Sequence, residues 1–285
     1  MRTPDNRVVS VLEQYQAQLA DRYSAGEVKA IVRTVFHERL GWDVSQMEIR
    51  KFGSLSESEL LKVYLPLKRL RAGEPMQYVL GEVDFHGLRI GVGPGVLIPR
   101  PETEEMVDHI VRYDPGPSRV LDIGTGSGCI GLAVKRAFPN ATVLATDVSP
   151  VALEIARRNG ALNDLEVEWV LHDILKEDPT SLGRFDLVVS NPPYVPRAEE
   201  MGLSEQVRDH EPHLALFVED EDPLLFYRVI ATKAKDVLVE GGHLWFEGHW
   251  FHAAGVGALL AELRYTSVEV LNDLSGNQRF IHARR

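Results

Sequence analysis

Hydrophobic residues follow two different spacings along the chain, and the first is helical. Up to about Gly73, apolar residues recur every three or four positions, as in Val28, Ile31, Val32, Val35 and Phe36. Capping boxes at 24–27 and 56–59 begin two of these helices, and Pro66 is expected to end or kink the second. The pattern predicts a small helical bundle over residues 1–73.

Residues 74–95 have a different character and form a link. Residues 78–81 and 83–90 are expected to make a short β-hairpin that turns at His86-Gly87, with several glycines after it. We therefore place a domain junction over 74–95. The next segment, 97–105, is expected to start a helix, with Pro101 near its first turn and glutamates that complement the helix dipole.

From Arg119 short apolar strands alternate with helices. Strands are expected at 120–123, 142–146, 167–171, 187–190 and 243–247, and helices at 130–138, after Ser149, at about 224–239 and at 253–263. Gly241-Gly242 is expected to separate the third helix from its strand, and 267–271 and 279–282 should form an antiparallel pair. The order predicts an α/β domain over 96–285, a Rossmann-like seven-stranded sheet with helices on both faces. Ligands bind at the carboxyl ends of such strands.

Composition and charge limit the classes of partner, the kinds of metal site and the cellular location that are expected for this chain. The chain has 285 residues and a net charge of −11, which argues against a broad grip on nucleic acid. Its one cysteine, Cys129, excludes an internal disulfide framework and a Cys-rich metal site, and is expected to be a packing residue. Residues 1–5 are polar and lack a secretory pattern, and no apolar run approaches the ~20 residues of a membrane span. A cytoplasmic location is expected.

A glycine-rich loop, 124–128, follows the first strand of the α/β domain. Glycines there let the backbone approach a ligand closely. Residues 126–131 also fit the G-x-G-x-x-G dinucleotide pattern with Asp147 about 20 residues on, so a nicotinamide cofactor must be weighed. Gly124 at the strand end and Asp122 inside the strand place that pattern out of register. The spacing that fits the strand end is Asp-x-Gly-x-Gly-x-Gly.

The fourth strand ends at Asn191-Pro192-Pro193-Tyr194. Neither proline donates a backbone hydrogen bond, and each fixes its φ, so the loop is rigid. It offers an amide side chain, carbonyl oxygens and an aromatic ring, which suit a planar NH2 group. The alternative is a strand that simply ends in a proline turn.

Together these motifs resemble class I S-adenosylmethionine-dependent methyltransferases. The resemblance assigns the ribose hydroxyls to Asp147, the adenine to Asp173 and Ile174, and Asn191 to the cofactor and the amine that is methylated. The remaining cofactor contacts come from Gly124, Thr125, Gly126, Ser127 and Gly128. No metal is expected, and His243, His249 and His252 are interpreted as core or surface histidines.

Four further segments narrow the resemblance, and they are 77–81, 97–104, 211–216 and 272–276. With the helical N-terminus they resemble the release-factor glutamine methyltransferases over essentially the full length. This implies N5-methylation of the glutamine in the Gly-Gly-Gln motif of class-1 peptide chain release factors. The product would be S-adenosylhomocysteine. We expect no direct nucleic-acid or membrane binding, a monomer, and substrate docking by residues 1–73.

The chain departs from this family at three places. Residues 217–223 replace a glycine-bearing loop, 249–251 stand where many members have a glutamine, and Ile174 stands where an aromatic residue is common. Adenine can pack on an isoleucine, so this change bears only on the affinity for the cofactor.

In the implied mechanism the catalytic residues are Asn191, Pro192 and Tyr194. Asn191 Oδ1 and the Pro192 carbonyl accept the two amide N–H bonds, Tyr194 packs on the amide plane, and Pro193 completes the substrate loop. Asp122 is expected to contact the cofactor through the loop or to brace the loop itself.

The sequence leaves open the roles of three further residues and the choice among several alternative functions. Leu97, Arg100 and Glu102 are expected to support the site from the side of the domain junction. The alternatives are a ribosomal-protein glutamine methyltransferase, an adenine-N6 methyltransferase on DNA or RNA, and a dinucleotide-dependent oxidoreductase.

Overall fold

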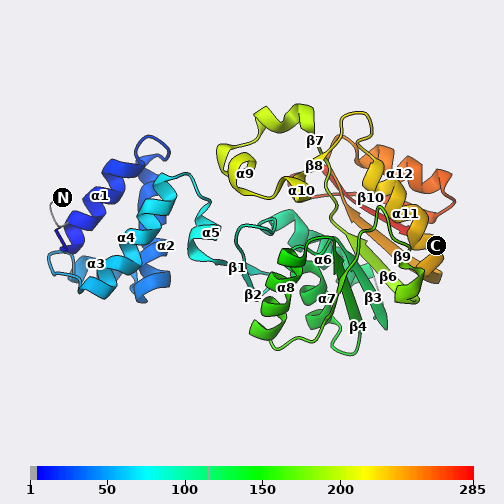
Figure 1. Ribbon diagram of the computed structural model, residues 1–285, viewed down its shortest axis with the longest axis horizontal. Coiled ribbons are helices and arrows are strands. Elements are labelled where there is room, and N and C mark those ends of the chain that lie inside the picture. The colour runs from blue at the N-terminus through cyan, green and yellow to red at the C-terminus, as the bar shows by residue number, and fades with distance from the viewer. Residues whose placement is uncertain (1–4, 114–115) are drawn as a thin grey trace. The chain divides into compact units, whose positions relative to one another are not determined.

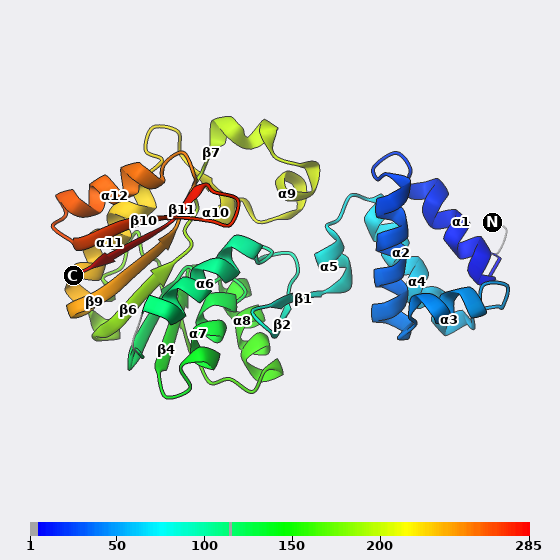
Figure 2. The same cartoon turned by 180° about the vertical axis from the view of Figure 1, so that it is seen from behind.

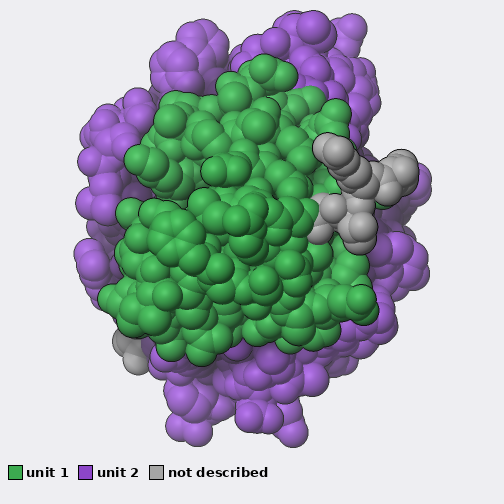
Figure 3. All heavy atoms as spheres, turned by 90° about the vertical axis from the view of Figure 1, so that its left-hand side faces the viewer, with its two compact units in different colours: residues 1–81 green, residues 82–285 purple. Residues whose placement is uncertain are grey.

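A computed structural model of the chain describes residues 5–113 and 116–285. The chain forms two compact units, Met1–Gly81 and Glu82–Arg285, which Figure 3 colours separately. Residues 1–4, part of the polar segment in which no secretory pattern is expected, lie outside the described residues. The boundaries at 1–73, 74–95 and 96–285 stay a prediction from sequence.

The smaller unit consists of helices, as the apolar spacing predicts. They are α1 (Val8–Leu19), α2 (Ala25–Leu40), α3 (Val44–Ile49), α4 (Glu57–Arg71) and α5 (Met76–Leu80). Both expected capping boxes are present, because Ser24 and Ser56 each exchange hydrogen bonds with the glutamate three residues on. Gly41 ends α2 in the left-handed conformation, with φ of 70°.

Pro66 was expected to end or kink the helix that contains it, and it does not end it. Helix α4 continues through Pro66 to Arg71, and the proline is buried. A proline removes one N–H from the helix ladder and crowds the preceding turn. Here the Tyr15 hydroxyl of α1 donates to the Val63 carbonyl at 2.5 Å, so a carbonyl of that turn is paired from another helix.

Residues 78–81 were expected to form part of a hairpin, and this prediction is wrong. Residues 78–80 instead form the last part of the short helix α5, and Gly81 follows it. The carbonyls at this helix end accept hydrogen bonds from two arginines of the same unit. Arg39 donates to the Val79 and Leu80 carbonyls, both at 2.9 Å, and Arg69 donates to the Tyr78 carbonyl at 3.0 Å. These partners satisfy groups that a helix end leaves unpaired.

The larger unit begins with the expected hairpin. Strands β1 (Glu82–Phe85) and β2 (Leu88–Gly91) pair antiparallel. His86 and Gly87 form the turn with φ of 47° and 72°, the positive angles that match the twist of a two-residue hairpin.

The central sheet of the larger unit is seven-stranded within the described residues. Its order is β10-β11-β9-β6-β3-β4-β5. Neighbours from β9 to β5 run parallel, whereas β11 pairs antiparallel with both β9 and β10, as expected for the last two strands. The strands are β3 (Arg119–Ile123), β4 (Thr142–Asp147), β5 (Glu168–Leu171), β6 (Phe185–Ser190), β9 (Leu238–Glu247), β10 (Thr266–Asn272) and β11 (Gln278–Arg284).

Helices cover both faces of this sheet (Figures 1 and 2). Neighbouring residues of a strand point to opposite faces, and β9 shows this directly. Trp245 stacks with His109 of one layer, and the next residue, Phe246, packs edge-on against Tyr227 of the other. The first layer is α6 (Pro101–Tyr113), α7 (Cys129–Ala137) and α8 (Pro150–Leu162), and the second is α11 (Leu225–Val237) and α12 (Ala253–Glu262).

Strand β9 begins earlier than expected. It starts at Leu238 and includes Gly241-Gly242, which the sequence pattern places between helix and strand. Pairing with β6 shifts register between Phe185 and Leu187, and Gly241 has φ of 76°. Strand β9 therefore continues through Gly241 with a local irregularity in its pairing to β6.

The segment between β6 and α11 was not predicted in detail. Strands β7 (Val195–Pro196) and β8 (Phe217–Val218) pair parallel, and between them lie η2 (Arg197–Gly202), α9 (Glu205–His210) and α10 (His213–Leu216). A separate short helix, η1 (Pro179–Leu182), precedes β6. Val195, Leu216 and Phe217 form a small apolar cluster against Leu97, so this segment has a core of its own. No helix of the described ranges is both long and apolar enough to span a bilayer.

Candidate active site

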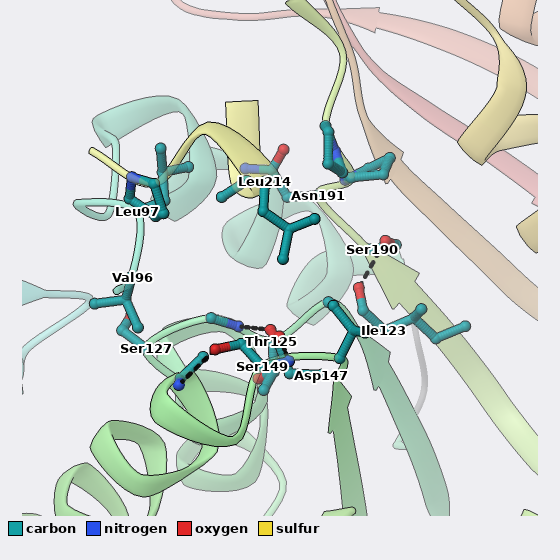
Figure 4. A pocket seen from close by; sticks show the side chains of 18 of the residues that line it. Val96, Leu97, Ile123, Thr125, Ser127, Asp147, Ser149, Ser190, Asn191 and Leu214 are labelled. Atoms are coloured by element: carbon teal, nitrogen blue, oxygen red, sulfur yellow. Dashed lines mark hydrogen bonds between the residues drawn. The ribbon is translucent and has the colours of Figure 1, made fainter. Parts of the chain in front are cut away.

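A cavity of about 650 Å³ opens at the carboxyl ends of β3, β4, β5 and β6. Its lining includes the last residues of these strands or those just after them, such as Ile123, Asp147, Asp173 and Asn191. Figure 4 shows Leu97, Leu214 and Asn191 across the cavity from Thr125, Ser127 and Asp147. The volume suits a small-molecule cofactor.

The glycine loop turns tightly because three of its residues have positive φ. Gly124, Gly126 and Gly128 have φ of 72°, 55° and 82°. The N–H groups of Gly124 and Thr125 both donate to the Thr146 carbonyl at 2.9 Å, which ties the loop to the end of β4. Gly124 through Ser127 line the cavity, so these four predicted residues meet there.

Gly128 does not line the cavity, and packing explains its identity. A Cβ at this position would lie 2.8 Å from the Trp169 ring and 3.1 Å from Ala156 Cβ. Gly128 precedes α7 in the left-handed conformation. The close approach of β5 and α8 therefore requires glycine here, and direct cofactor contact by Gly128 stays a prediction.

Asp147 brings a carboxylate to the loop from the end of β4. Oδ2 accepts the Gly126 N–H at 2.9 Å and Oδ1 accepts the Ser149 N–H at 2.8 Å. Burial raises the pKa of this carboxyl, and hydrogen bonds from backbone N–H groups oppose the rise. A carboxylate has about four lone-pair directions, so each oxygen can accept one more hydrogen bond from a ligand hydroxyl.

Asp122 lies beneath the loop and braces it. Its Oδ2 accepts from Thr125 Oγ1 at 2.5 Å and from the Gly131 N–H at 3.0 Å, and the residue is fully buried. Burial raises the pKa of Asp122 to about 7. A Cβ at Gly131 would lie 3.1 Å from Asp122 Oδ2, so the last glycine of the G-x-G-x-x-G pattern makes room for this carboxylate. Of the two expectations for Asp122, the contacts fit the brace.

Three adjacent residues that follow β5 line the cavity, namely His172, Asp173 and Ile174. Lys176 donates to Asp173 Oδ2 at 2.8 Å, and this hydrogen bond lowers the pKa of the carboxyl. Ile174 is buried and belongs to the apolar core on the α11 side of the sheet. His172 was not singled out from sequence, although it directly precedes the predicted pair.

Asn191, Pro192 and Pro193 line the cavity where β6 ends, whereas Tyr194, which was predicted with them, is not among the lining residues. Asn191 Nδ2 donates to Thr103 Oγ1 at 3.4 Å, which engages the amide nitrogen and leaves Oδ1 to accept. The Tyr194 hydroxyl donates to Glu247 Oε1 at 3.4 Å. Burial raises the pKa of Tyr194, so its hydroxyl keeps its proton.

Two residues that sequence reasoning did not select connect Asn191 with Tyr194. Thr103 Oγ1 donates to Glu247 Oε2 at 2.7 Å. Glu247 is the last residue of β9 and is 1% exposed. Part of the signal was present, since Thr103 lies in the family segment 97–104 and Glu247 ends the strand expected at 243–247.

The three supporting residues predicted from sequence have different positions. Leu97 lines the cavity, whereas Arg100 Nη2 donates to Glu211 Oε1 at 2.6 Å, and Glu211 Oε2 accepts the Ile98 N–H at 3.0 Å. Glu102 lies in the first turn of α6 outside the cavity lining. The buried Glu211 thus fixes the segment before α6, and Pro212, Leu214 and Ala215 beside it were not predicted as lining residues.

The histidines weighed as metal ligands have other contacts. His243 and His282 lie 3.2 Å apart between ring nitrogens, and His249 packs near Tyr194 with Glu199 3.5 Å away. Within 5–113 and 116–285 no group of three or more His, Cys, Asp or Glu side chains is arranged to hold a metal ion. The absence of a metal stays a prediction.

Comparison with known proteins first identifies the class of the fold. Residues 103–208 match the family model of the methyltransferase small domain. A solved methyltransferase from Pyrococcus furiosus has a TM-score of 0.52 at 24% identity, covers 70% of this chain and is itself covered to 89%, which confirms the fold.

Two curated relatives are similar over almost the whole chain, and both are named release factor glutamine methyltransferase. The one from Bacteroides thetaiotaomicron is 40% identical over 98% of this chain and 100% of its own length. The one from Flavobacterium psychrophilum is 37% identical over 94% of this chain and 95% of its own length. The chain therefore belongs to the release factor glutamine methyltransferase family, and the sequence-based prediction of this family is confirmed.

Proposed function

We propose that the protein transfers a methyl group from S-adenosylmethionine to the side-chain amide nitrogen of the glutamine in the Gly-Gly-Gln motif of a class-1 peptide chain release factor. The observation that carries the proposal is Asn191 at the cavity, with its amide nitrogen engaged by Thr103 and its oxygen left to accept. An acceptor suits a substrate NH2 group. Family membership supports the same substrate.

The lining fits S-adenosylmethionine in its polar and apolar parts. Ser127 Oγ and His172 Nε2 are buried atoms of lining residues without hydrogen-bond partners among the described residues, so the cavity has polar atoms to spare for a ligand. We propose that Asp147 holds the ribose hydroxyls, that Asp173 and Ile174 hold the adenine, and that Gly124–Ser127 hold the amino-acid end. Ile230 and Phe226 add apolar surface. When bound, S-adenosylmethionine supplies an electrophilic methyl group.

The protein's part in the reaction is to orient a poor nucleophile. The lone pair of an amide nitrogen is delocalised into its carbonyl group. Asn191 Oδ1 and the Pro192 carbonyl accept the two substrate N–H bonds and so fix the direction of the lone pair, and Tyr194 packs on the amide plane. Positioning of this kind contributes several kcal/mol. A strong general base is not needed, because the nitrogen proton becomes acidic as the new bond forms.

A labelled-methyl transfer assay tests the proposed substrate. S-adenosylmethionine is offered with a class-1 release factor, its Gly-Gly-Gln variant in which the glutamine is alanine, a ribosomal protein, or duplex DNA. We expect label on the intact release factor alone, since a planar amide satisfies the acceptors at Asn191 and Pro192. Label on the ribosomal protein or the DNA instead would show that the proposed substrate is wrong, although methyl transfer from S-adenosylmethionine to a nitrogen would still be supported.

We also propose that the helical unit docks the substrate protein. Ile49 and Phe52 are 83% and 79% exposed, so this unit has large apolar side chains available to a protein partner. A chain limited to 82–285 is expected to have a KM for the intact release factor raised by roughly tenfold, the equivalent of about 1.4 kcal/mol of lost binding. Turnover of a short Gly-Gly-Gln peptide serves as the folding control and should be unchanged. Equal turnover of the intact factor with and without 1–81 would refute the docking hypothesis.

The oligomeric state and the cellular location stay predictions.

A further inference from the structure

We propose that Glu247 and Thr103 are positioning residues that set which end of the Asn191 amide faces the substrate. This rests on the proposed function, in which Asn191 Oδ1 accepts an N–H bond of the substrate amide. Neither residue needs to touch the reacting atoms to have this effect. They act through the direction in which each hydrogen bond of the group donates.

The group is assembled from four parts of the sequence. Asn191 follows β6, Thr103 lies in the first turn of α6, Glu247 ends β9, and Tyr194 follows the two prolines. The hydrogen bonds run from Asn191 Nδ2 to Thr103 Oγ1 at 3.4 Å, from Thr103 Oγ1 to Glu247 Oε2 at 2.7 Å, and from the Tyr194 hydroxyl to Glu247 Oε1 at 3.4 Å. Both carboxylate oxygens therefore hold a hydroxyl of the site.

An ionised carboxylate fixes the polarity of this chain because it only accepts. Thr103 has one hydroxyl proton, and it donates this proton in its hydrogen bond to Glu247. The oxygen of Thr103 is then left with lone pairs, which face Asn191. If the Asn191 amide were rotated by half a turn, its oxygen would meet the Thr103 oxygen with no proton between them, and an unpaired buried acceptor is costly. Asn191 consequently keeps Nδ2 against Thr103 and presents Oδ1.

Glu247 is held in place independently of these hydroxyl groups. Its backbone carbonyl accepts from the Tyr227 hydroxyl at 3.1 Å, and β11 pairs with it through Phe280. The carboxylate is thus attached to the sheet rather than to a loop. A rigid carboxylate that orients a second polar group has the same logic as the buried aspartate that holds a catalytic histidine in one tautomer.

The charge on Glu247 depends on pH within an accessible range. Burial raises its pKa to about 6, Thr103 and Arg279 lower it, and Glu102 raises it. The other titratable groups that face it are Tyr194, Tyr227 and Cys129, and burial raises the pKa of all three, so they stay neutral. Below about pH 6 the protonated carboxyl can donate to Thr103, which frees the threonine proton to turn toward Asn191.

The kinetic test compares Glu247→Gln and Thr103→Val with Glu262→Gln, a change at an exposed glutamate at the end of α12. The carboxamide of the first variant brings an N–H donor into the group, and the valine removes the hydroxyl. Each is expected to lower kcat at least roughly tenfold, by analogy with residues that orient other catalytic groups. The KM for the release factor and the affinity for S-adenosylhomocysteine should change less. The two losses should not add in the double variant, because both break the same chain.

The pH profile of kcat separates orientation from simple support of the fold. The wild-type kcat should fall below about pH 6 as Glu247 takes up a proton. This acid limb should be absent from Glu247→Gln and present in Glu262→Gln. A Glu247→Gln variant with wild-type kcat and the same acid limb would overturn the proposal.

A spectroscopic readout needs no substrate and keeps the inference apart from the proposed function. The ¹⁵N side-chain amide signal of Asn191 is assigned by its disappearance in Asn191→Asp. In the wild type it should shift with a midpoint near pH 6, and in Glu247→Gln it should be displaced and insensitive to pH. If no substrate is methylated while this signal behaves as expected, the proposed function fails and the positioning chain stands. An unaltered, pH-independent signal in both proteins would refute the chain. Thr103→Val gives the same readout should Glu247→Gln fail to fold.

Discussion

Replacing Asn191 with alanine is expected to lower kcat for methyl transfer by roughly 10²-fold or more, the usual loss when an oriented polar group is removed from a reacting centre. Asn191 Oδ1 is the acceptor that the hydrogen bond to Thr103 leaves available. Without it one substrate N–H bond has no partner, and the amide lone pair is no longer aimed. Pro192 remains, so binding of the release factor should weaken less than kcat falls.

Steady-state kinetics and calorimetric binding of S-adenosylhomocysteine check this expectation together. Asn140→Ala is a matched control, because Asn140 is an exposed asparagine in the turn between α7 and β4. It should leave both kcat and binding unchanged. Near-wild-type turnover by Asn191→Ala would mean that the amide does not orient the substrate, and the mechanism would have to be abandoned.

Gly128→Ala is expected to destabilise the larger unit by roughly 2–4 kcal/mol, and Gly124→Ala by only about 1–2 kcal/mol. Both residues have φ in the left-handed region, so both variants are strained. Only the Gly128 Cβ would also meet Trp169 and Ala156, whereas the space around a Cβ at Gly124 is open within 4 Å. The difference between the two variants therefore isolates the packing contact beneath the glycine loop.

Denaturant unfolding without cofactor measures the two free energies of unfolding, and Gly124→Ala is the internal control for backbone strain. Titration with S-adenosylhomocysteine then shows which variant also loses affinity. Equal destabilisation of the two variants would show that Trp169 and Ala156 move aside at no cost, and that position 128 requires glycine for its φ alone.

Much of this molecule follows from local patterns in the sequence. The alternation of strands and helices from Arg119 onward predicts the sheet, and it also predicts that Asp147, Asp173 and Asn191 meet, because parallel strands end at one edge. The hairpin turn at His86-Gly87 is predicted equally well, since positive φ at both positions is a local requirement. Family resemblance supplied the substrate, which no pattern of spacing contains.

The features that were missed depend on partners distant in sequence. The carbonyls at the end of α5 pair with Arg39 and Arg69, and the local run of β-favouring residues does not reveal these arginines. Pro66 of α4 is buried, and the Val63 carbonyl in the turn before it accepts a hydrogen bond from Tyr15 of another helix, a contact that local sequence does not reveal. Thr103 and Glu247 lie 144 positions apart, so their hydrogen bond becomes visible only when α6 and β9 are placed together.

The hydrogen bonds of Glu211 have a consequence for the construction of chimeras. The segment from β7 to β8 carries its own apolar cluster, yet it is joined to the start of α6 by Arg100 and the Ile98 N–H. A graft of 195–218 from a relative into this chain would therefore exchange only half of a two-part module. Recombination that keeps residues 97–100 and 195–218 from the same parent preserves these hydrogen bonds, and a hybrid in which Arg100 no longer faces a carboxylate at position 211 is expected to be less active.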